Sequence, residues 1–322
     1  MSVPVDGAVL AGEVQVPEGE ALASVLLLSG SGPQDRFQTI DGVGTFGILA
    51  EAICAEGFTV TIWDDRGVGG STGAYLEADE DDLAADVCAI AAWLTTRTGR
   101  ADHLLVGHSQ GTLVAMLAAI ASPGSFRGLV LLAPPGRPGR EVLLWQHRRL
   151  LRAAGASEDE AELSCRRQGR LFDILSDWGA GLGAGGEGSA ARNRIAGRLK
   201  GVLAEGIEGD PDEPTRAAID EAVEDLMEWE WRFLLRSEPA RLLSRLRCPV
   251  AVIVGDMDDH VDARADVDAL RASGKTFALK ILSNHDHLFR HIGPVPRSGA
   301  RPFSDVALKA IRETLREICH ET

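Results

Sequence analysis

Residues 107–111 read Gly-His-Ser-Gln-Gly, so Ser109 stands at the centre of a Gly-x-Ser-x-Gly pattern. An apolar run precedes this pentapeptide and a helical pattern follows it. In so tight a turn from strand to helix, the glycines leave room around the serine, whose strained backbone exposes the side-chain oxygen. The positive end of the following helix points at that oxygen, and the backbone N–H of Gln110 is placed to bind a developing oxyanion. The pattern therefore predicts that Ser109 is a nucleophile in acyl transfer.

A serine nucleophile needs a base, and the base needs an orienting carboxylate. Two polar clusters follow apolar runs later in the chain, at residues 255–262 and 283–289. The first cluster holds Asp256, Asp258, Asp259 and Asp262, and the second holds His285 and His287. A single aspartate in such a loop is usually a helix N-cap or a solvated charge. The order Ser, Asp, His, with each residue after a predicted strand, favours a catalytic set, but position alone leaves these acids and histidines in competition.

A loop of small residues follows the run at residues 25–28 and reads Ser-Gly-Ser-Gly-Pro-Gln-Asp-Arg over residues 29–36. Small residues let the backbone approach a substrate, so this loop is expected to supply the second oxyanion donor. By position, the N–H of Ser31 is the first candidate and that of Gly32 is the second. A phosphate-binding loop is the alternative, but neither Gly-Lys-Ser/Thr nor Gly-x-Gly-x-x-Gly occurs here.

Two neighbouring carboxylates, Asp64 and Asp65, precede Arg66 and a group of glycines, which invites a metal interpretation. We favour instead an Asp–Arg pair that closes a turn, with the glycines taking positive φ. His108 is expected to pack beside the nucleophile, and the other histidines outside the second cluster lack the spacing of metal ligands. The sequence thus predicts no metal and no cofactor.

The elements that must position these residues follow from the hydrophobic pattern. Short apolar runs, most of them apolar on both faces, occupy residues 25–28, 58–63, 103–106, 129–133, 250–254 and 277–282. Such strands are typical of a parallel sheet covered by helices on both sides. Helical patterns at residues 47–56, 82–96 and 110–121 alternate with them, which predicts an α/β fold with a doubly wound, mostly parallel sheet. Residues 8–16 are expected to form an antiparallel hairpin that turns at Ala11 and Gly12.

The alternation stops over residues 140–245, where only helical patterns occur. These patterns lie at residues 141–153, 158–177, 190–205 and 215–236. A glycine-rich stretch at residues 179–188 interrupts them and is too flexible for a regular element. We interpret the segment as a helical cap, or lid, inserted into a core of residues 1–139 and 246–322. The cap is expected to cover Ser109 and to shape the acyl pocket.

Composition limits the partners of the chain. Its 322 residues carry a formal net charge of -15 and give a sequence pI of about 5.0, which disfavours binding to nucleic acid. No run approaches the ~20 apolar residues of a membrane helix, and residues 1–6 lack the basic start of a signal peptide. The five cysteines are odd in number, far apart and without a Cys-x-x-Cys pair. This pattern indicates free thiols in a reducing compartment, so we expect a cytoplasmic protein.

Taken together, the motifs resemble those of the dienelactone-hydrolase-like and prolyl-oligopeptidase-like serine esterases of the α/β-hydrolase superfamily. Five segments carry the resemblance, at residues 29–36, 64–73, 107–111, 248–258 and 287–289. They spread over nearly the whole chain except the predicted cap. The resemblance implies that the acid is Asp258, the aspartate of Gly-x-x-Asp, and that the base is His287, the histidine before Leu-Phe. It also implies hydrolysis of acyl esters, thioesters or lactones without a cofactor.

A physical argument favours the same histidine. The apolar pair Leu288 and Phe289 can anchor the loop in the core, and a base must be held to within about half an ångström of its productive position. His285 lies between Asn284 and Asp286 and has no such anchor. We therefore expect His285 to pack or hydrogen-bond locally.

The expected function is that of a serine hydrolase which cleaves a carboxylic ester, thioester or lactone through an acyl-enzyme on Ser109. Asp258 and His287 complete the catalytic set, Ser31 and Gln110 form the oxyanion hole, and the partner is a small-molecule acyl substrate. The alternative is an acyltransferase or cyclase that passes the same acyl group to an acceptor other than water. A non-catalytic binding protein is disfavoured because it has no need for a strained turn. The sequence leaves the oligomeric state open, a homo-oligomer included.

Overall fold

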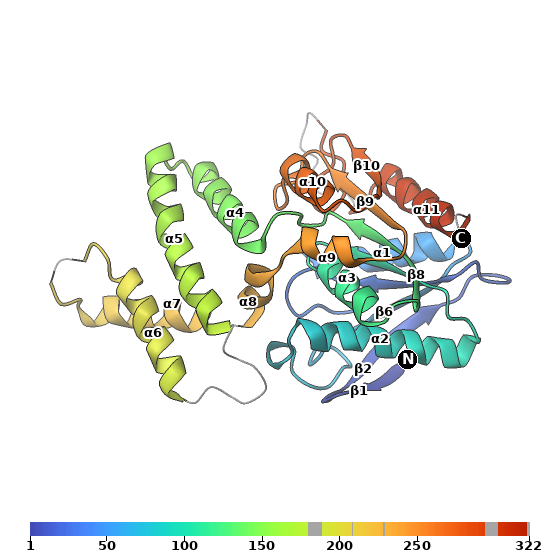
Figure 1. The fold of residues 1–322 in the computed structure, drawn as a ribbon, viewed down its shortest axis with the longest axis horizontal. Helices are drawn as coiled ribbons and strands as arrows, with labels where there is room; N and C mark the ends of the chain where they lie inside the picture. Colours follow the sequence, from blue (N-terminus) through green and yellow to red (C-terminus); the bar gives the residue numbers. More distant parts are fainter. Residues whose placement is uncertain (180–188, 208, 228, 294–301, 321–322) are drawn as a thin grey trace. The chain divides into compact units, whose positions relative to one another are not determined.

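The chain divides into two compact units in the computed structural model, which describes every residue except 180–188, 208, 228, 294–301 and 321–322 (Figure 1). The first unit comprises Met1–Arg137 and Glu238–Thr322, and the second comprises Pro138–Ser237. The second unit is thus an insertion into the sequence of the first. No described helix is long and apolar enough to cross a membrane.

A single large sheet forms the centre of the first unit. Its described strands, in spatial order, are β1 (Ser2–Val5), β2 (Ala8–Gln15), β6 (Thr59–Trp63), β3 (Ser24–Leu28), β7 (His103–His108), β8 (Phe126–Leu132), β9 (Val250–Gly255) and β10 (Ala278–Leu282). Strands β1 and β2 run antiparallel at one edge, and all the strands from β6 to β10 pair in parallel. The central strands are buried along their whole length, as strands covered on both faces must be. The expectation of a mostly parallel sheet is confirmed.

The edge hairpin turns at a different place from the one we expected. Val5 pairs with Ala8, so the chain turns at Asp6 and Gly7, and Gly7 takes a φ of 69°. Gly12 instead lies inside β2, where a Cβ atom would come within 2.3 Å of the Ile62 carbonyl oxygen. The glycine that looked like a turn residue is there because the neighbouring strand approaches closely.

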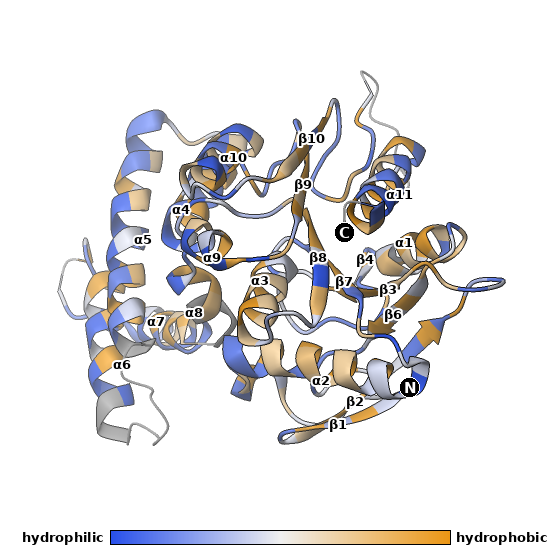
Figure 2. Cartoon of the chain, turned by 45° about the vertical axis from the view of Figure 1, so that its right-hand side comes forward, coloured by the Kyte–Doolittle hydropathy of each residue, from blue (hydrophilic) through white to orange (hydrophobic). Residues whose placement is uncertain are grey.

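Helices cover both faces of the sheet. Helices α1 (Thr45–Cys54) and α11 (Asp305–His320) lie side by side, and their apolar residues form one core cluster with the strands (Figure 2). Helices α2 (Glu80–Thr98), α3 (Gly111–Ala121), α9 (Pro239–Arg245) and α10 (Ala263–Ala272) form a second, contiguous group. Helix α9 falls within the segment that we expected to belong to the cap, but it packs on α3 and α10 of the first unit. A small hairpin of β4 (Thr39–Ile40) and β5 (Val43–Gly44) precedes α1, and a short 3₁₀ helix (Tyr75–Glu77) precedes α2.

The second unit contains only helices in its described part. They are α4 (Gly139–Ala153), α5 (Glu158–Gly179), α6 (Ser189–Leu203), α7 (Glu213–Leu226) and α8 (Trp229–Arg236). Their apolar faces form a separate core, in which Leu175, Leu199 and Val223 are almost fully buried. The single helix that we expected at residues 215–236 is wrong, because α7 ends with Met227 as its C-cap. Neither glycine nor proline marks that end, so the helical pattern runs on in the sequence. The glycine-rich stretch lies outside the described residues from residue 180 onward.

Candidate active site

Ser109 occupies the turn between β7 and α3. Its φ is 53°, a left-handed value that disfavours residues other than glycine, and its N–H donates a 2.9 Å hydrogen bond to the Leu132 carbonyl oxygen on the next strand. A Cβ atom on Gly107 would lie 2.5 Å from the Gly111 carbonyl oxygen, and one on Gly111 would lie 2.3 Å from that of Ser29. Both glycines of the pattern are therefore required by backbone contacts. The strand, turn and helix expected around residues 107–111 are all present.

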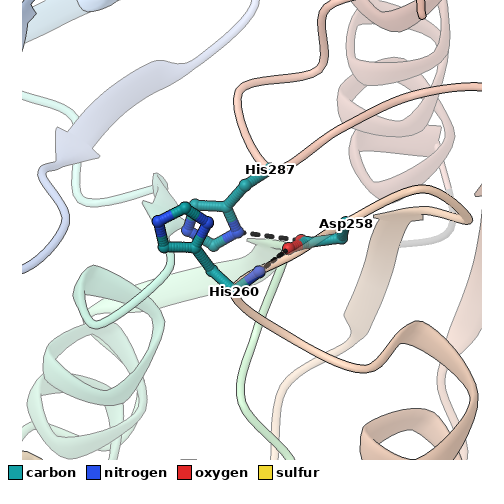
Figure 3. Close-up of side chains that lie close together, drawn as sticks. All are labelled: Asp258, His260 and His287. Carbon is teal, nitrogen blue, oxygen red and sulfur yellow. Dashed lines mark hydrogen bonds and ion pairs between the residues drawn. The ribbon is translucent and has the colours of Figure 1, made fainter. Parts of the chain in front are cut away.

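His287 lies in the loop after β10, and its Nδ1 is 2.8 Å from the Oδ2 of Asp258, which follows β9 (Figure 3). A carboxylate only accepts, so the proton of this bond stands on Nδ1 and the lone pair is on Nε2 of His287. The other carboxylate oxygen, Oδ1, accepts the backbone N–H groups of His260 and Val261. The side chains of His287 and Asp258 are 10% and 1% exposed, so the pair is buried.

Burial by itself raises the pKa of the Asp258 carboxyl group. The hydrogen bond and charge of His287, together with the N–H groups of Val261 and His260, outweigh that effect and bring the pKa below its ordinary value. Asp258 is therefore ionised at neutral pH, and it is able to fix the tautomer of His287 and to stabilise its protonated form.

The three competing acids have other partners. Asp256 is exposed and accepts the Asn284 N–H at 2.6 Å. Asp259 Oδ1 lies 2.8 Å from His260 Nδ1, and Asp262 caps the N-terminus of α10. Within the described residues, Asp258 is the acid that meets His287.

His285 is buried, and its ring nitrogens bond to residues outside the catalytic set. Its Nδ1 donates to the Ser283 carbonyl oxygen at 2.9 Å, and its Nε2 is 2.7 Å from Ser304 Oγ. The neighbouring Phe289 is 0% exposed and stacks on Phe303, with ring centroids 5.7 Å apart. The aromatic residue two positions after His287 therefore anchors the loop in the core.

Ser109 and His287 line one cavity of about 350 Å³ in the first unit. The same cavity is lined by Gly30, Ser31, Gln34, Gln38, Ile40, Asp41, His108, Asp259, His260, Leu288 and Arg290. This volume is within the range of ligand pockets for small molecules. Ser109 Oγ makes no hydrogen bond to His287 among the described residues; in enzymes without substrate such bonds are often long and shorten on binding.

The two expected oxyanion donors line different cavities. In the described part of the chain, the backbone N–H groups of Ser31 and Gln110 donate to no acceptor, whereas the Gly30 N–H is bound by Gln38 Oε1 at 2.7 Å. Ser31 lines the cavity of Ser109, and Gly32 does not. Gln110 lines a neighbouring cavity of about 40 Å³, and its buried side-chain oxygen has no hydrogen-bond partner among the described residues.

Asp64 and Arg66 do not pair with each other as we expected. Asp64 binds the Arg36 guanidinium through both oxygens and accepts the Gly70 N–H, and Arg66 binds Asp86 on α2 at 2.7 Å. The pairs instead fasten the loop at residues 29–36 and helix α2 to the end of β6.

Asp65 also holds that loop, because its Oδ2 accepts the Gln34 N–H at 2.9 Å and the Ser29 hydroxyl at 3.4 Å. Burial raises the pKa of the Asp65 carboxyl group to about 7. Sequence reasoning considered this residue only for a metal site or for an Asp–Arg pair that closes the turn.

Asp258, His260 and His287 offer ligand atoms within 4.8 Å of one another, so they are the described group that comes nearest to a metal site. Both carboxylate oxygens of Asp258 already accept hydrogen bonds. The rings of His260 and His287 stack, with centroids 4.6 Å apart and an interplanar angle of 18° (Figure 3). Their nitrogen lone pairs lie in the planes of the rings, so they are confined to two nearly parallel planes and do not converge on one ion. The arrangement suits an acid–base pair better than metal coordination. Sequence reasoning missed the contact of His260, for which its position two residues after Asp258 was the only signal.

Comparison with known proteins shows the family and the fold of the chain. Residues 39–290 match the family model described as serine aminopeptidase, S33. Esterase EstD of Thermotoga maritima is 28% identical over 169 residues, a match that covers 52% of this chain and 40% of that protein. A thermostable carboxyl esterase from Bacillus coagulans, solved with glycerol, is similar with a TM-score of 0.59 and 16% identity over 99% of this chain and 98% of that one. Est1E from Butyrivibrio proteoclasticus, solved with ferulic acid, has a TM-score of 0.56 and 16% identity over 100% of this chain and 98% of that one. At these identities the two structures establish a shared fold.

Proposed function

Because the chain belongs to the serine aminopeptidase S33 family and has the α/β-hydrolase fold, we propose that it is a serine esterase which cleaves small acyl substrates through an acyl-enzyme on Ser109. The single observation that carries the proposal is the buried 2.8 Å pair of His287 and Asp258, whose histidine lines the same cavity as Ser109. The family match favours hydrolysis over acyl transfer to another acceptor or cyclisation.

The proposed reaction has two halves. His287 Nε2 takes the proton of Ser109 Oγ as this oxygen attacks the carbonyl carbon, and the N–H groups of Gln110 and Ser31 bind the oxyanion. His287 then passes the proton to the leaving oxygen or sulfur, which departs and leaves the acyl group on Ser109. Water, deprotonated by His287, attacks the acyl carbon, releases the acid and returns the proton to Ser109. Each oxyanion donor contributes about 3 kcal/mol to the transition state.

Asp258 keeps the Nδ1 proton of His287 in place throughout, so the lone pair on Nε2 stays directed toward Ser109. Carboxylic esters, thioesters and lactones all fit this chemistry, because each has a carbonyl carbon with an oxygen or sulfur leaving group. In a lactone the leaving oxygen stays on the acyl chain, and water then releases a hydroxy acid.

We also propose that the helical second unit acts as a cap that selects the acyl group. Its support is that an independent helical core is inserted between β8 and β9. Strand β8 pairs with β7, which leads to Ser109, and β9 leads to Asp258. Substitutions in this unit should shift the preferred acyl chain length, with little change in the labelling of Ser109 by a small probe.

A cytoplasmic location is part of the proposal. It rests on the five cysteines, none of which is bonded to another. Thiols of this kind persist where glutathione keeps proteins reduced.

The test is covalent labelling. A fluorophosphonate should label the wild-type protein on Ser109, as located by mass spectrometry of the labelled peptide, and the Ser109→Ala variant should remain unlabelled. A panel of nitrophenyl esters of increasing chain length should be hydrolysed by the wild type and not by the variant, with circular dichroism showing that both are folded. Hydrolysis at the wild-type rate by Ser109→Ala would refute the proposal.

A further inference from the structure

A buried side chain outside the triad, Gln38, joins two parts of the site. It is 1% exposed and lies in the loop that follows residues 29–36. Its Oε1 accepts the Gly30 N–H at 2.7 Å, and its Nε2 is 3.0 Å from Thr45 Oγ1 and 3.3 Å from His108 Nδ1. Because a backbone N–H only donates, Oε1 must face Gly30, and this fixes the orientation of the amide.

The proton positions around Gln38 follow from the same reasoning. The Thr45 hydroxyl donates to the Gln38 carbonyl oxygen at 2.9 Å, so Thr45 Oγ1 accepts from Gln38 Nε2. The second proton on Nε2 points to His108 Nδ1, which therefore accepts. The amide oxygen and both amide protons of Gln38 are thus directed by a partner.

His108 connects Gln38 to the backbone of the catalytic base, His287. With Nδ1 as an acceptor, its proton is on Nε2, which donates to the backbone carbonyl oxygen of His287 at 2.9 Å. Burial, and to a smaller extent the charge of the nearby His287, lowers the pKa of His108 to about 3. The ring is therefore neutral at neutral pH. The chain of bonds from Gln38 to His287 is therefore neutral and runs in one direction.

The hydrogen-bonded network of Gln38, Gly30 and His108 lies next to Ser109. A Cβ atom built on Gly30 would lie 3.5 Å from both Gln38 Oε1 and His108 Nδ1, and 3.6 Å from Ser109 Cβ. Gln38 also keeps a φ of 45°, a conformation that persists in a non-glycine residue only where the surroundings determine it.

We propose that Gln38 is a positioning residue, which through Gly30 sets the oxyanion loop that includes Ser31 and through His108 sets the backbone of His287. The inference rests on the function proposed above. Gln38 thereby couples the position of the base to that of an oxyanion donor, two groups that come from opposite ends of the sequence.

The variant Gln38→Glu tests the direction of the bonds. It keeps an oxygen for the Gly30 N–H but places an acceptor opposite His108 Nδ1. A neutral His108 must then carry its proton on Nδ1, and it can no longer donate to the His287 carbonyl oxygen. One extra proton, on either the introduced carboxylate or His108, restores both bonds.

We expect kcat of Gln38→Glu to fall about 10- to 100-fold at pH 8 with KM changed less than about threefold, because misplacing a catalytic group by about 1 Å costs on the order of 100-fold. The ratio of variant to wild-type kcat should rise as the pH is lowered from 8 to 6. Gln15→Glu is the matched control, since Gln15 is the last residue of β2 and, among the described residues, its side chain bonds to Glu13. It should keep the wild-type kcat and a flat ratio over the same pH range.

Two variants of His108 give a second arm that does not depend on the folding of Gln38→Glu. A glutamine side chain in place of His108 can still donate to the His287 carbonyl oxygen, whereas a leucine side chain cannot, so His108→Gln should retain at least about tenfold more kcat than His108→Leu. Equal kcat in these two variants, or a pH-independent ratio for a folded Gln38→Glu, would overturn the inference. If instead the wild type is neither labelled by the fluorophosphonate nor hydrolyses the nitrophenyl esters, the proposed function itself is overturned.

Discussion

The imidazole ring of His260 stacks on that of His287, with centroids 4.6 Å apart, while His260 itself remains exposed on its outer side. The nitrogen lone pairs of stacked rings lie in nearly parallel planes and do not converge on one ion, and both oxygens of Asp258 are already engaged. In the proposed reaction Asp258 and His287 act as the acid–base pair, and no proposed step requires a metal ion at Asp258, His260 and His287.

From this relationship we predict that incubation with a chelator such as EDTA leaves ester hydrolysis unchanged. The rate should be measured before chelation, after dialysis and after return of Zn²⁺. A loss that zinc reverses would show that Asp258, His260 and His287 serve as ligands.

We predict that Asp258→Asn lowers kcat about 10⁴-fold, because the amide no longer holds the correct tautomer of the base. Asp256→Asn should cost less than about tenfold, since Asp256 binds only the backbone of Asn284. Steady-state kinetics of the two variants with one nitrophenyl ester provide the comparison. A larger loss in Asp256→Asn would show that the acid had been assigned to the wrong residue.

For the two histidines of the same loop, we predict opposite behaviour. His287→Ala should lose activity on the order of 10⁶-fold, as expected when a base is removed from a serine nucleophile. His285→Ala should stay active but lose about 1–3 kcal/mol of unfolding free energy, since it leaves Ser304 and Ser283 without their buried partner. Kinetics and urea unfolding of both variants test the pair. An inactive His285→Ala beside an active His287→Ala would reverse the assignment.

Asp65 should make stability depend on pH. An acid whose pKa is about 7 in the folded state and ordinary in the unfolded state binds more protons when folded, so the free energy of unfolding falls as the pH rises from about 4 to 7. Part of the Asp65 side chain remains exposed, which reduces the size of this effect.

The variant Asp65→Asn keeps an oxygen for the Gln34 N–H and removes the titration. Its unfolding free energy relative to the wild type should therefore increase between pH 5 and pH 8, as measured by urea unfolding at both values. A difference that does not change with pH would mean that Asp65 is ionised normally.

The glycines of the turn that holds Ser109 give a prediction about packing. Gly111→Ala should lower the unfolding free energy by about 3 kcal/mol or more, because its Cβ would meet the Ser29 carbonyl oxygen at 2.3 Å. Gly30→Ala is the matched control, as its Cβ would find only ordinary contacts, the nearest at 3.5 Å. Thermal unfolding of both variants distinguishes them. Equal melting temperatures would show that the turn at Ser109 has room for a side chain at residue 111.

Much of the fold could be predicted because its signals are local. The buried strands are short apolar runs, and every run that we expected between residues 25 and 282 corresponds to a strand of the sheet. The hairpin turn and the end of α7 could not be predicted in this way. Gly7 and Gly12 are both glycines in the sequence, and only the approach of β6 shows which one is inside a strand. Met227 ends a helix with no residue that forbids its continuation.

The sequence by itself determined where a nucleophile would stand, because the demands on Ser109 are met by its immediate neighbours: two glycines, a strand before and a helix after. Tertiary structure decided which acid meets which histidine, since Asp258 and His287 come together only when β9 and β10 pair in parallel and bring their carboxyl ends to one edge. It alone decided the contacts of Gln38, whose partners lie up to 70 residues away. A hydrogen bond between distant residues leaves no periodicity in the sequence, because only the folded backbone sets its geometry.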